Sequence, residues 1–328
     1  MTNPLIPIKL LCSILVITKL TACELDKPST QNHYSSTVQV QTNSADDTTV
    51  IDFSGRKFKF STPVKRIVAL APHIVENLYS IGAGDLIVGV VSHSDYPKEA
   101  LELPIVGGYK KINFEAIMAL EPDVVIGWTS GNSTDILNKV EELGIPVILD
   151  QPDTLEDIAT SLRMLGRLTG LQTEADTKAT EFSTKLSSLR AANHKKPKIK
   201  TFYQVWNDPL ITINGNHIIS DAIETCGGLN VFSSSVATAP RTNIESVIVE
   251  APEAIIASGM GTARPEWLDD WKQWDVIPAV SKGNLFFVNP DHLQRHTVRQ
   301  LQAIETICAQ LDQARSKNSK SKIAHKEQ

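Results

Sequence analysis

A fourteen-residue segment that occurs twice constrains the fold of this chain more than any other feature. Residues 113–126 read NFEAIMALEPDVVI and residues 243–256 read NIESVIVEAPEAII, so the copies lie 130 positions apart without a gap. Each copy begins with an Asn suited to cap a helix and continues as a short amphipathic helix that a Pro ends. A buried strand follows. Two such units predict two similar α/β lobes.

Other apolar runs indicate the strands of these lobes. Uninterrupted apolar strands are typical of parallel sheets that are covered on both faces. We therefore predict an α/β protein with two Rossmann-like lobes, residues 50–153 and residues 198–314. The expected strands of the first lobe are 66–71, 86–92, 124–129 and 146–150, and those of the second are 200–206, 254–258 and 285–289.

The lobes are predicted to be joined by helix. Residues 154–197 carry apolar residues at helical spacing, and their first forty positions contain no Pro. This pattern indicates one long connecting helix, or a helix broken near Gly170. A last helix is expected at 292–314, after Pro290.

Both ends of the chain differ from its body. Residues 1–22 place a short apolar run, 10–17, behind Lys9, which indicates an export signal too short to span a membrane. The sequence Leu-Thr-Ala-Cys that ends at Cys23 resembles the bacterial lipobox, although Lys19 departs from that pattern. We expect Cys23 to be lipidated and to hold the protein at a membrane, inner or outer. The alternative is an uncleaved N-terminal anchor.

Two terminal segments are predicted to be disordered. Residues 23–49 are rich in small polar residues and carry too few large apolar groups to order themselves, so we expect a tether. Residues 315–328 are expected to form a disordered basic tail. The net charge is -5, but the ends contribute +2 and +4, so the body carries -11. That charge opposes a nucleic-acid partner.

The cysteines indicate an oxidising compartment. Cys12 leaves with the signal and Cys23 is expected to carry lipid, which leaves Cys226 and Cys308 as an even pair. We predict a disulfide between them. The alternative is two unrelated buried thiols.

Several motifs together resemble the substrate-binding proteins of bacterial ABC importers for cobalamin, haem and siderophores, over residues 50–312. The motifs are a hairpin-like IDFSGRKFKFS at 51–61, KRIVALAPH at 65–73, SDYP at 94–97, NFE at 113–115, PDVVIGWT at 122–129 and CGGLNVF at 226–232. The resemblance implies that a rigid helix joins the lobes and that the ligand occupies the cleft between them. It also supports the Cys226–Cys308 bond.

Within the family the match is to cobalamin-binding members, through the SDYP stretch, the Gly-Asn after Trp128, the Cys-Gly-Gly motif and Asp291 followed by Arg295. This resemblance implies a monomeric periplasmic protein that captures cobalamin as cargo, without a cofactor of its own. It would deliver the ligand to an ABC permease dimer with its ATPase. Haem or a ferric siderophore is the alternative ligand.

Glu115 and Glu245 each follow an Asn N-cap by two residues. A carboxylate there can simply complement the helix dipole, which is worth about 0.3–1 kcal/mol. In the family, a glutamate on each lobe docks into arginines of the permease. The resemblance therefore implies that Glu115 and Glu245 orient docking, and both roles can hold together.

Ligand-cleft candidates follow from the strand ends, because open α/β sheets bind ligands beyond the carboxyl ends of their strands. Aromatic faces suit a corrin ring and a few polar groups can bond its amide side chains. The alternatives are that Trp128 and Tyr109 belong to the core and that Asp291 with Arg295 forms a surface i, i+4 pair. The candidates are Pro72, His73, His93, Tyr109, Trp128, Trp206, Asp291 and Arg295.

No dedicated metal site is predicted. His73, His93, His292 and His296 fall near the expected cleft, so one of them could ligate the metal of a bound macrocycle, but no metal-binding spacing occurs. Trp267, Trp271 and Trp274 share one helical face. We expect this face to pack against the second lobe; the alternative is that it forms an additional wall of the cleft.

Motifs of nucleophilic hydrolases, phosphate-binding loops and dinucleotide sites are absent. We therefore expect no enzymatic activity; an anchored hydrolase is a distant alternative.

Overall fold

The computed structural model describes residues 48–108, 111–259, 261 and 263–324. The predicted signal peptide, Cys23, Tyr109 and all but the last two positions of the tether lie outside these residues. Among the described residues, no helix is both long and apolar enough to cross a membrane.

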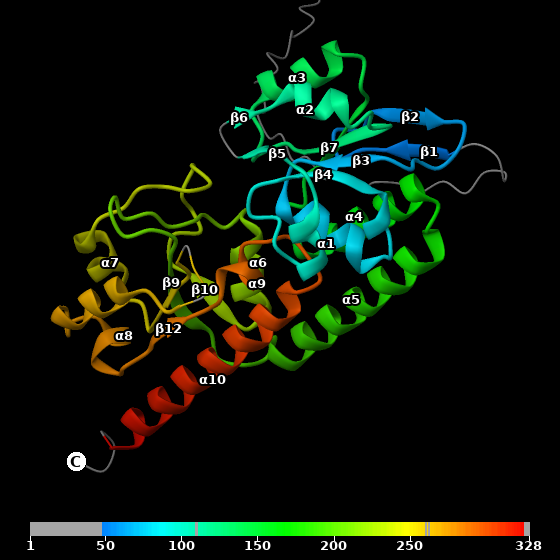
Figure 1. The fold of residues 1–328 in the computed structure, drawn as a ribbon. Helices are drawn as coiled ribbons and strands as arrows, with labels where there is room; N and C mark the ends of the chain where they lie inside the picture. Colours follow the sequence, from blue (N-terminus) through cyan, green and yellow to red (C-terminus); the bar gives the residue numbers. More distant parts are fainter. Residues whose placement is uncertain (1–47, 109–110, 260, 262, 325–328) are drawn as a thin grey trace, which may run out of the picture. The chain divides into compact units, whose positions relative to one another are not determined.

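The first lobe is built on a six-stranded sheet with the order β6-β5-β4-β3-β7-β8 (Figure 1). Neighbouring strands are parallel except that β6 is antiparallel to β5. The strands are β3 (Ile67–Ala69), β4 (Ile87–Val91), β5 (Ile105–Gly108), β6 (Lys111–Ile112), β7 (Val124–Trp128) and β8 (Val147–Asp150).

Helices cover both faces of this sheet. Alternate residues of β3 and β7 enter different apolar clusters, as the period of two along a strand requires. Helix α1 (Pro72–Ser80) packs in one cluster, and α2 (Phe114–Ala119) and α3 (Thr134–Glu142) pack in the other. An antiparallel hairpin of β1 (Thr48–Ile51) and β2 (Lys57–Phe60) precedes the sheet, and two 3-10 turns are η1 (Gly84–Leu86) and η2 (Lys98–Glu102).

The second lobe has a four-stranded, fully parallel sheet with the order β10-β9-β11-β12. Helices again lie on both faces, so two lobes with parallel sheets are confirmed. The elements are β9 (Ile199–Gln204), α6 (Ile218–Thr225), β10 (Gly228–Asn230), α7 (Ile244–Glu250), β11 (Ala254–Ala257), η3 (Glu266–Gln273), α8 (Pro278–Ser281), β12 (Leu285–Phe287), α9 (Pro290–Leu293) and α10 (Gln300–Ala324).

The repeated segment forms the same unit in both lobes. Asn113 Oδ1 accepts the backbone N–H of Ala116 at 3.1 Å at the start of α2, and Asn243 Oδ1 accepts that of Ser246 at 2.8 Å at the start of α7. Each helix leads into a buried strand, β7 or β11. The caps and the strands are therefore those that the sequence predicts.

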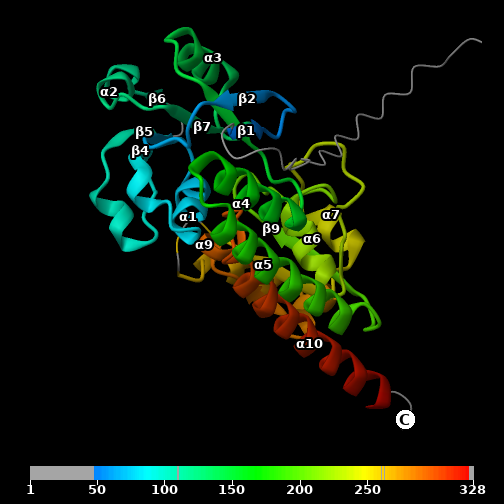
Figure 2. The same cartoon turned by 90° about the vertical axis from the view of Figure 1, so that its right-hand side faces the viewer.

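The connection between the lobes consists of two helices, α4 (Leu155–Thr169) and α5 (Gln172–Asn193). The alternative with a break near Gly170 therefore describes it, rather than one continuous helix. Gly170 ends α4 in the left-handed conformation, with φ of 79°, which glycine adopts without strain. Helices α4 and α5 pack against each other, and α5 runs beside α10 in both views (Figures 1 and 2).

The C-terminal helix differs from the prediction. The expected helix 292–314 is divided into α9 and α10, and α10 continues through Ala324. The expectation of a disordered tail is thus corrected for residues 315–324. Arg315 donates to the carbonyls of Cys226 and Gly227 at 2.6 and 3.1 Å, and Lys317 donates to those of Lys282 and Gly283 at 2.9 Å. These carbonyls lie at the ends of α6 and α8, where cations stabilise a helix.

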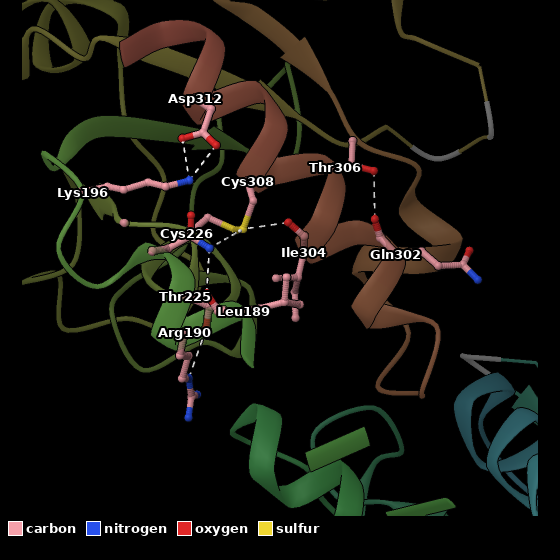
Figure 3. The surroundings of a disulfide bond; sticks show 12 residues. Leu189, Arg190, Lys196, Thr225, Cys226, Gln302, Ile304, Thr306, Cys308 and Asp312 are labelled. Atoms are coloured by element: carbon pink, nitrogen blue, oxygen red, sulfur yellow. Dashed lines mark hydrogen bonds and ion pairs between the residues drawn. A yellow bond between two sulfur atoms is a disulfide. The ribbon is translucent and has the colours of Figure 1, made fainter. Parts of the chain in front are cut away.

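The predicted disulfide is confirmed. Cys226, at the end of α6, is bonded to Cys308 on α10, 82 positions away (Figure 3). Nearby, Lys196 Nζ lies 2.7 Å from a carboxylate oxygen of Asp312, which joins α10 to the segment that enters β9. The bond therefore anchors the last helix against the second lobe.

Candidate ligand cleft and docking residues

A cavity of about 530 Å³ is lined by residues of both lobes. The first lobe contributes Trp128 at the end of β7 and residues that follow β7 and β8, such as Asp153. The second lobe contributes residues around β9, at the start of α6 and just after α9. This is the position expected for a ligand in open α/β sheets. The lining is aromatic, aliphatic and neutral polar, and Asp153 is its one charged side chain among the described residues.

Trp128 lies at the centre of a group of three rings. Its indole makes edge contacts with His73 and His296, at centroid distances of 5.2 and 5.5 Å, and the two imidazoles are 5.3 Å apart. Gly131 leaves room for the indole, because a Cβ there would lie 1.8 Å from Trp128 Cε3. Trp128 thus both packs against the protein and faces the cavity.

The other candidates of the first lobe lie in different surroundings. Pro72 begins α1, and His73 is buried with Nε2 3.3 Å from Asp150 Oδ2. His73 thus contacts Trp128 but is not part of the cavity lining. His93 is exposed and has a φ of 69°.

Two histidines that line the cavity stay neutral at pH 7. Burial lowers the pKa of His217 to about 4. Burial also lowers the pKa of His296 well below its usual value, and the neighbouring imidazoles of His73 and His217 lower it further, since they disfavour a second positive charge. His217 Nδ1 accepts the backbone N–H of Ile219 at 3.1 Å, which assigns the proton of the neutral ring to Nε2. His217 showed no functional signal in the sequence; its position at the start of α6 brings it here.

Arg295 forms ion pairs with three carboxylates. Its Nη1 donates to Glu76 Oε1 at 2.8 Å and to Asp95 Oδ1 at 2.7 Å, and its Nη2 lies 3.0 Å from Asp291 Oδ1. Burial disfavours the charge, but the hydrogen bonds to Asp95 and Glu76 raise the pKa of Arg295. The i, i+4 pair of Asp291 and Arg295 exists, yet it belongs to a larger group in which Arg299 also binds Glu76.

Trp206 belongs to the edge of this region. The residue is 39% exposed and its Nε1 donates to the carbonyl of Asp208 at 3.0 Å. The preceding residue, Val205, lines the cavity, whereas Trp206 does not. No group of three His, Cys, Asp or Glu suited to hold a metal ion occurs in the part of the chain that the structure describes.

Glu115 and Glu245 occupy equivalent positions on the two lobes. Each is the second residue of its helix, α2 or α7, and each is exposed. Neither carboxylate has an ion-pair partner among the described residues. Both side chains are therefore accessible to a partner protein.

The arrangement of two lobes around a lined cleft agrees with the comparison to known proteins. The profile of the family described as periplasmic binding protein matches residues 67–292. The chain belongs to this family. The Vitamin B12-binding protein of Vibrio parahaemolyticus is 36% identical over 258 residues, which cover 78% of this chain and 92% of that protein.

Solved structures agree in fold. The crystal structure of the periplasmic Vitamin B12 binding protein BtuF of Vibrio cholerae is 34% identical, with a TM-score of 0.71, and the match covers 77% of this chain and 98% of that chain. The periplasmic heme-binding protein RhuT of Roseiflexus sp. RS-1 shares the fold at 21% identity, with a TM-score of 0.68, over 76% of this chain and 99% of that chain.

Proposed function

We propose that this periplasmic binding protein captures cobalamin between its lobes and delivers it to an ABC permease without performing chemistry. The observation that carries the proposal is the charge of the cleft. Among the described residues, the cavity lining contains no Lys or Arg, and its two histidines stay neutral at pH 7. A cleft of this kind suits a large, uncharged, amide-bearing macrocycle.

The same observation disfavours the alternative ligands. Haem carries two carboxylates and ferric siderophores are commonly anionic, so either would be favoured by cationic side chains that face the cleft. Arg295 is the nearest candidate in the sequence, but three carboxylates surround it. The relatives named Vitamin B12-binding proteins, at 31–36% identity, also support cobalamin.

A calorimetric titration of the purified protein with cyanocobalamin, with haem in parallel, tests the ligand. We expect one-to-one binding of cyanocobalamin at micromolar affinity or tighter and no binding of haem. Haem binding with a shifted Soret band, together with no heat from cyanocobalamin, would overturn the assignment.

Delivery is proposed to depend on Glu115 and Glu245, which would pair with cationic side chains on the two permease subunits. Their exposure, their equivalent positions and their lack of partners among the described residues support this role. Glu115→Ala with Glu245→Ala should abolish cobalamin uptake by cells and leave the calorimetric affinity unchanged. A large loss of affinity in this double variant would contradict a docking role.

Attachment to a membrane through lipid on Cys23 completes the proposal. Cys23→Ser should move the protein from the membrane fraction to the soluble periplasmic fraction. Retention of the variant in the membrane fraction would instead favour an uncleaved N-terminal anchor.

A further inference from the structure

A second cavity, of about 290 Å³, lies on the opposite face of β9 from the cleft. Gln204 lines it, whereas its neighbours Tyr203 and Val205 line the cleft, as the alternation of side chains along a strand requires. We call this cavity the tryptophan pocket and define it by Trp267, Trp271, Trp274, Ile244, Glu245 and Asp270.

The wall of the tryptophan pocket is held in place. Trp271 is 5% exposed, and its Nε1 donates to Gln204 Oε1 at 2.6 Å. Its ring makes an edge contact with Phe202 at 5.6 Å. Trp267 and Trp274 are half-buried against the same apolar cluster, so part of each indole remains open to the pocket. The predicted packing of the stripe is therefore right, and the cavity beside it is separate from the cleft.

The rim of the pocket is acidic and uncompensated. Glu245 and Asp270 are exposed, and neither carboxylate has a cationic partner in the described part of the chain. The cations on η3 and just before it are engaged elsewhere: Arg264 and Lys272 bind Asp269, at 2.6 and 3.0 Å. No Lys or Arg lines the pocket among the described residues, so its two charges are both negative.

Aromatic faces beside carboxylates are the surroundings that a flat organic cation prefers. A guanidinium stacks on an indole and donates to carboxylates with its fixed fork of N–H groups, which an ammonium cannot do. We infer that the tryptophan pocket receives an arginine side chain of the permease, which stacks on Trp274 and pairs with Asp270 as well as Glu245. The inference rests on the proposed function, because it requires that Glu245 faces the permease.

With an arginine of the permease in the tryptophan pocket, the second lobe would dock through more than a single exposed ion pair. Isolated surface pairs contribute little affinity, since water and salt screen them. A guanidinium enclosed by indoles is less exposed to water, and its pairs with Glu245 and Asp270 gain strength accordingly. The pocket would therefore select arginine over lysine at one position of the permease.

The test measures binding of the full-length protein to the permease and ATPase complex in lipid nanodiscs. Trp274→Leu keeps apolar bulk but removes the aromatic face, and Asp270→Asn removes one charge at an exposed position where folding is not at risk. We expect each to weaken binding about tenfold. Trp274→Phe should restore most of the affinity. Glu266→Gln, an exposed carboxylate on the same η3 and outside the pocket, is the matched control and should bind like wild type.

The outcomes separate this inference from the proposed function. If Glu245→Ala weakens docking but Trp274→Leu and Asp270→Asn do not, the pocket inference is overturned and the docking role stands. If Glu245→Ala also has no effect, docking through this lobe fails, while the cyanocobalamin titration still decides the ligand. Saturable quenching of tryptophan fluorescence by tetramethylammonium, with unchanged permease binding of both pocket variants, would reassign the pocket to a small organic cation.

Discussion

Replacement of Glu76 by Gln should destabilise the protein strongly, because this carboxylate is the buried centre of a network that links the two lobes. Its side chain is 3% exposed on α1 of the first lobe. Oε1 accepts from Arg295 and Arg299 at 2.8 and 2.6 Å, and Oε2 accepts from Arg299 Nε at 2.9 Å. The side chains of Arg295 and Arg299 are only 13% and 12% exposed, so water cannot fully replace a lost carboxylate.

The magnitude follows from these contacts. Removal of one partner from a buried ion pair costs about 3–5 kcal/mol, because it leaves an uncompensated charge. Here each arginine keeps another contact. Arg295 retains Asp95 and Asp291, and the guanidinium of Arg299 lies 3.8 Å from the ring centre of Tyr96. We therefore expect the lower end of that range, about 3 kcal/mol.

Urea unfolding followed by circular dichroism at pH 7 measures this change. Glu141→Gln is the control, because Glu141 pairs with Arg56 at the surface, where both side chains are more than a third exposed. That variant should lose less than about 1 kcal/mol. If Glu76→Gln loses no more than Glu141→Gln, the argument from burial is wrong.

Three further predictions concern other parts of the molecule. Since the folded pKa of His217 is about 4 and the unfolded value is about 6.5, the unfolded chain binds more protons between them, so stability falls as pH decreases through this range, by about 3 kcal/mol. His217→Asn, which retains a helix cap, should flatten that dependence in urea titrations at several pH values. Cys226→Ala with Cys308→Ala opens a loop closed over 82 positions and should cost about 4.5 kcal/mol in urea unfolding. Gly131→Ala displaces the indole of Trp128 and should weaken calorimetric cobalamin binding about tenfold with little loss of helix content.

Each of these three predictions can be contradicted by a specific result. A wild-type stability that stays level from pH 6.5 to 4 would contradict the neutral, buried state of His217. Unchanged stability of the variant without the disulfide would mean that its unfolded chain has no more conformational freedom than the disulfide-bonded unfolded chain. Unchanged affinity in Gly131→Ala would place the ligand away from Trp128.

Local sequence pattern determined most of the helices and strands of this protein. The repeat predicts the two caps, Asn113 and Asn243, because a cap and a Pro stop act within a few residues of chain. Uninterrupted apolar runs predict most of the parallel strands, because burial on both faces removes any need for alternation. They do not predict β5 and β10, which are short and contain Gly. An even pair of cysteines predicts the bond between Cys226 and Cys308, because paired thiols form disulfides in an oxidising compartment.

Only the tertiary structure decided which side chains of the two lobes meet. Glu76 and Arg295 are 219 positions apart, and no local signal marks Glu76 as the partner of two arginines. His217 and Trp128 line the same cavity from different lobes, so their proximity depends on how α4 and α5 hold those lobes together. Hydrophobic periodicity and helix capping depend on residues that are close together in the sequence, within one helix or strand. Ion pairs, neutral buried histidines and cavity walls instead arise from packing between elements that are distant in sequence.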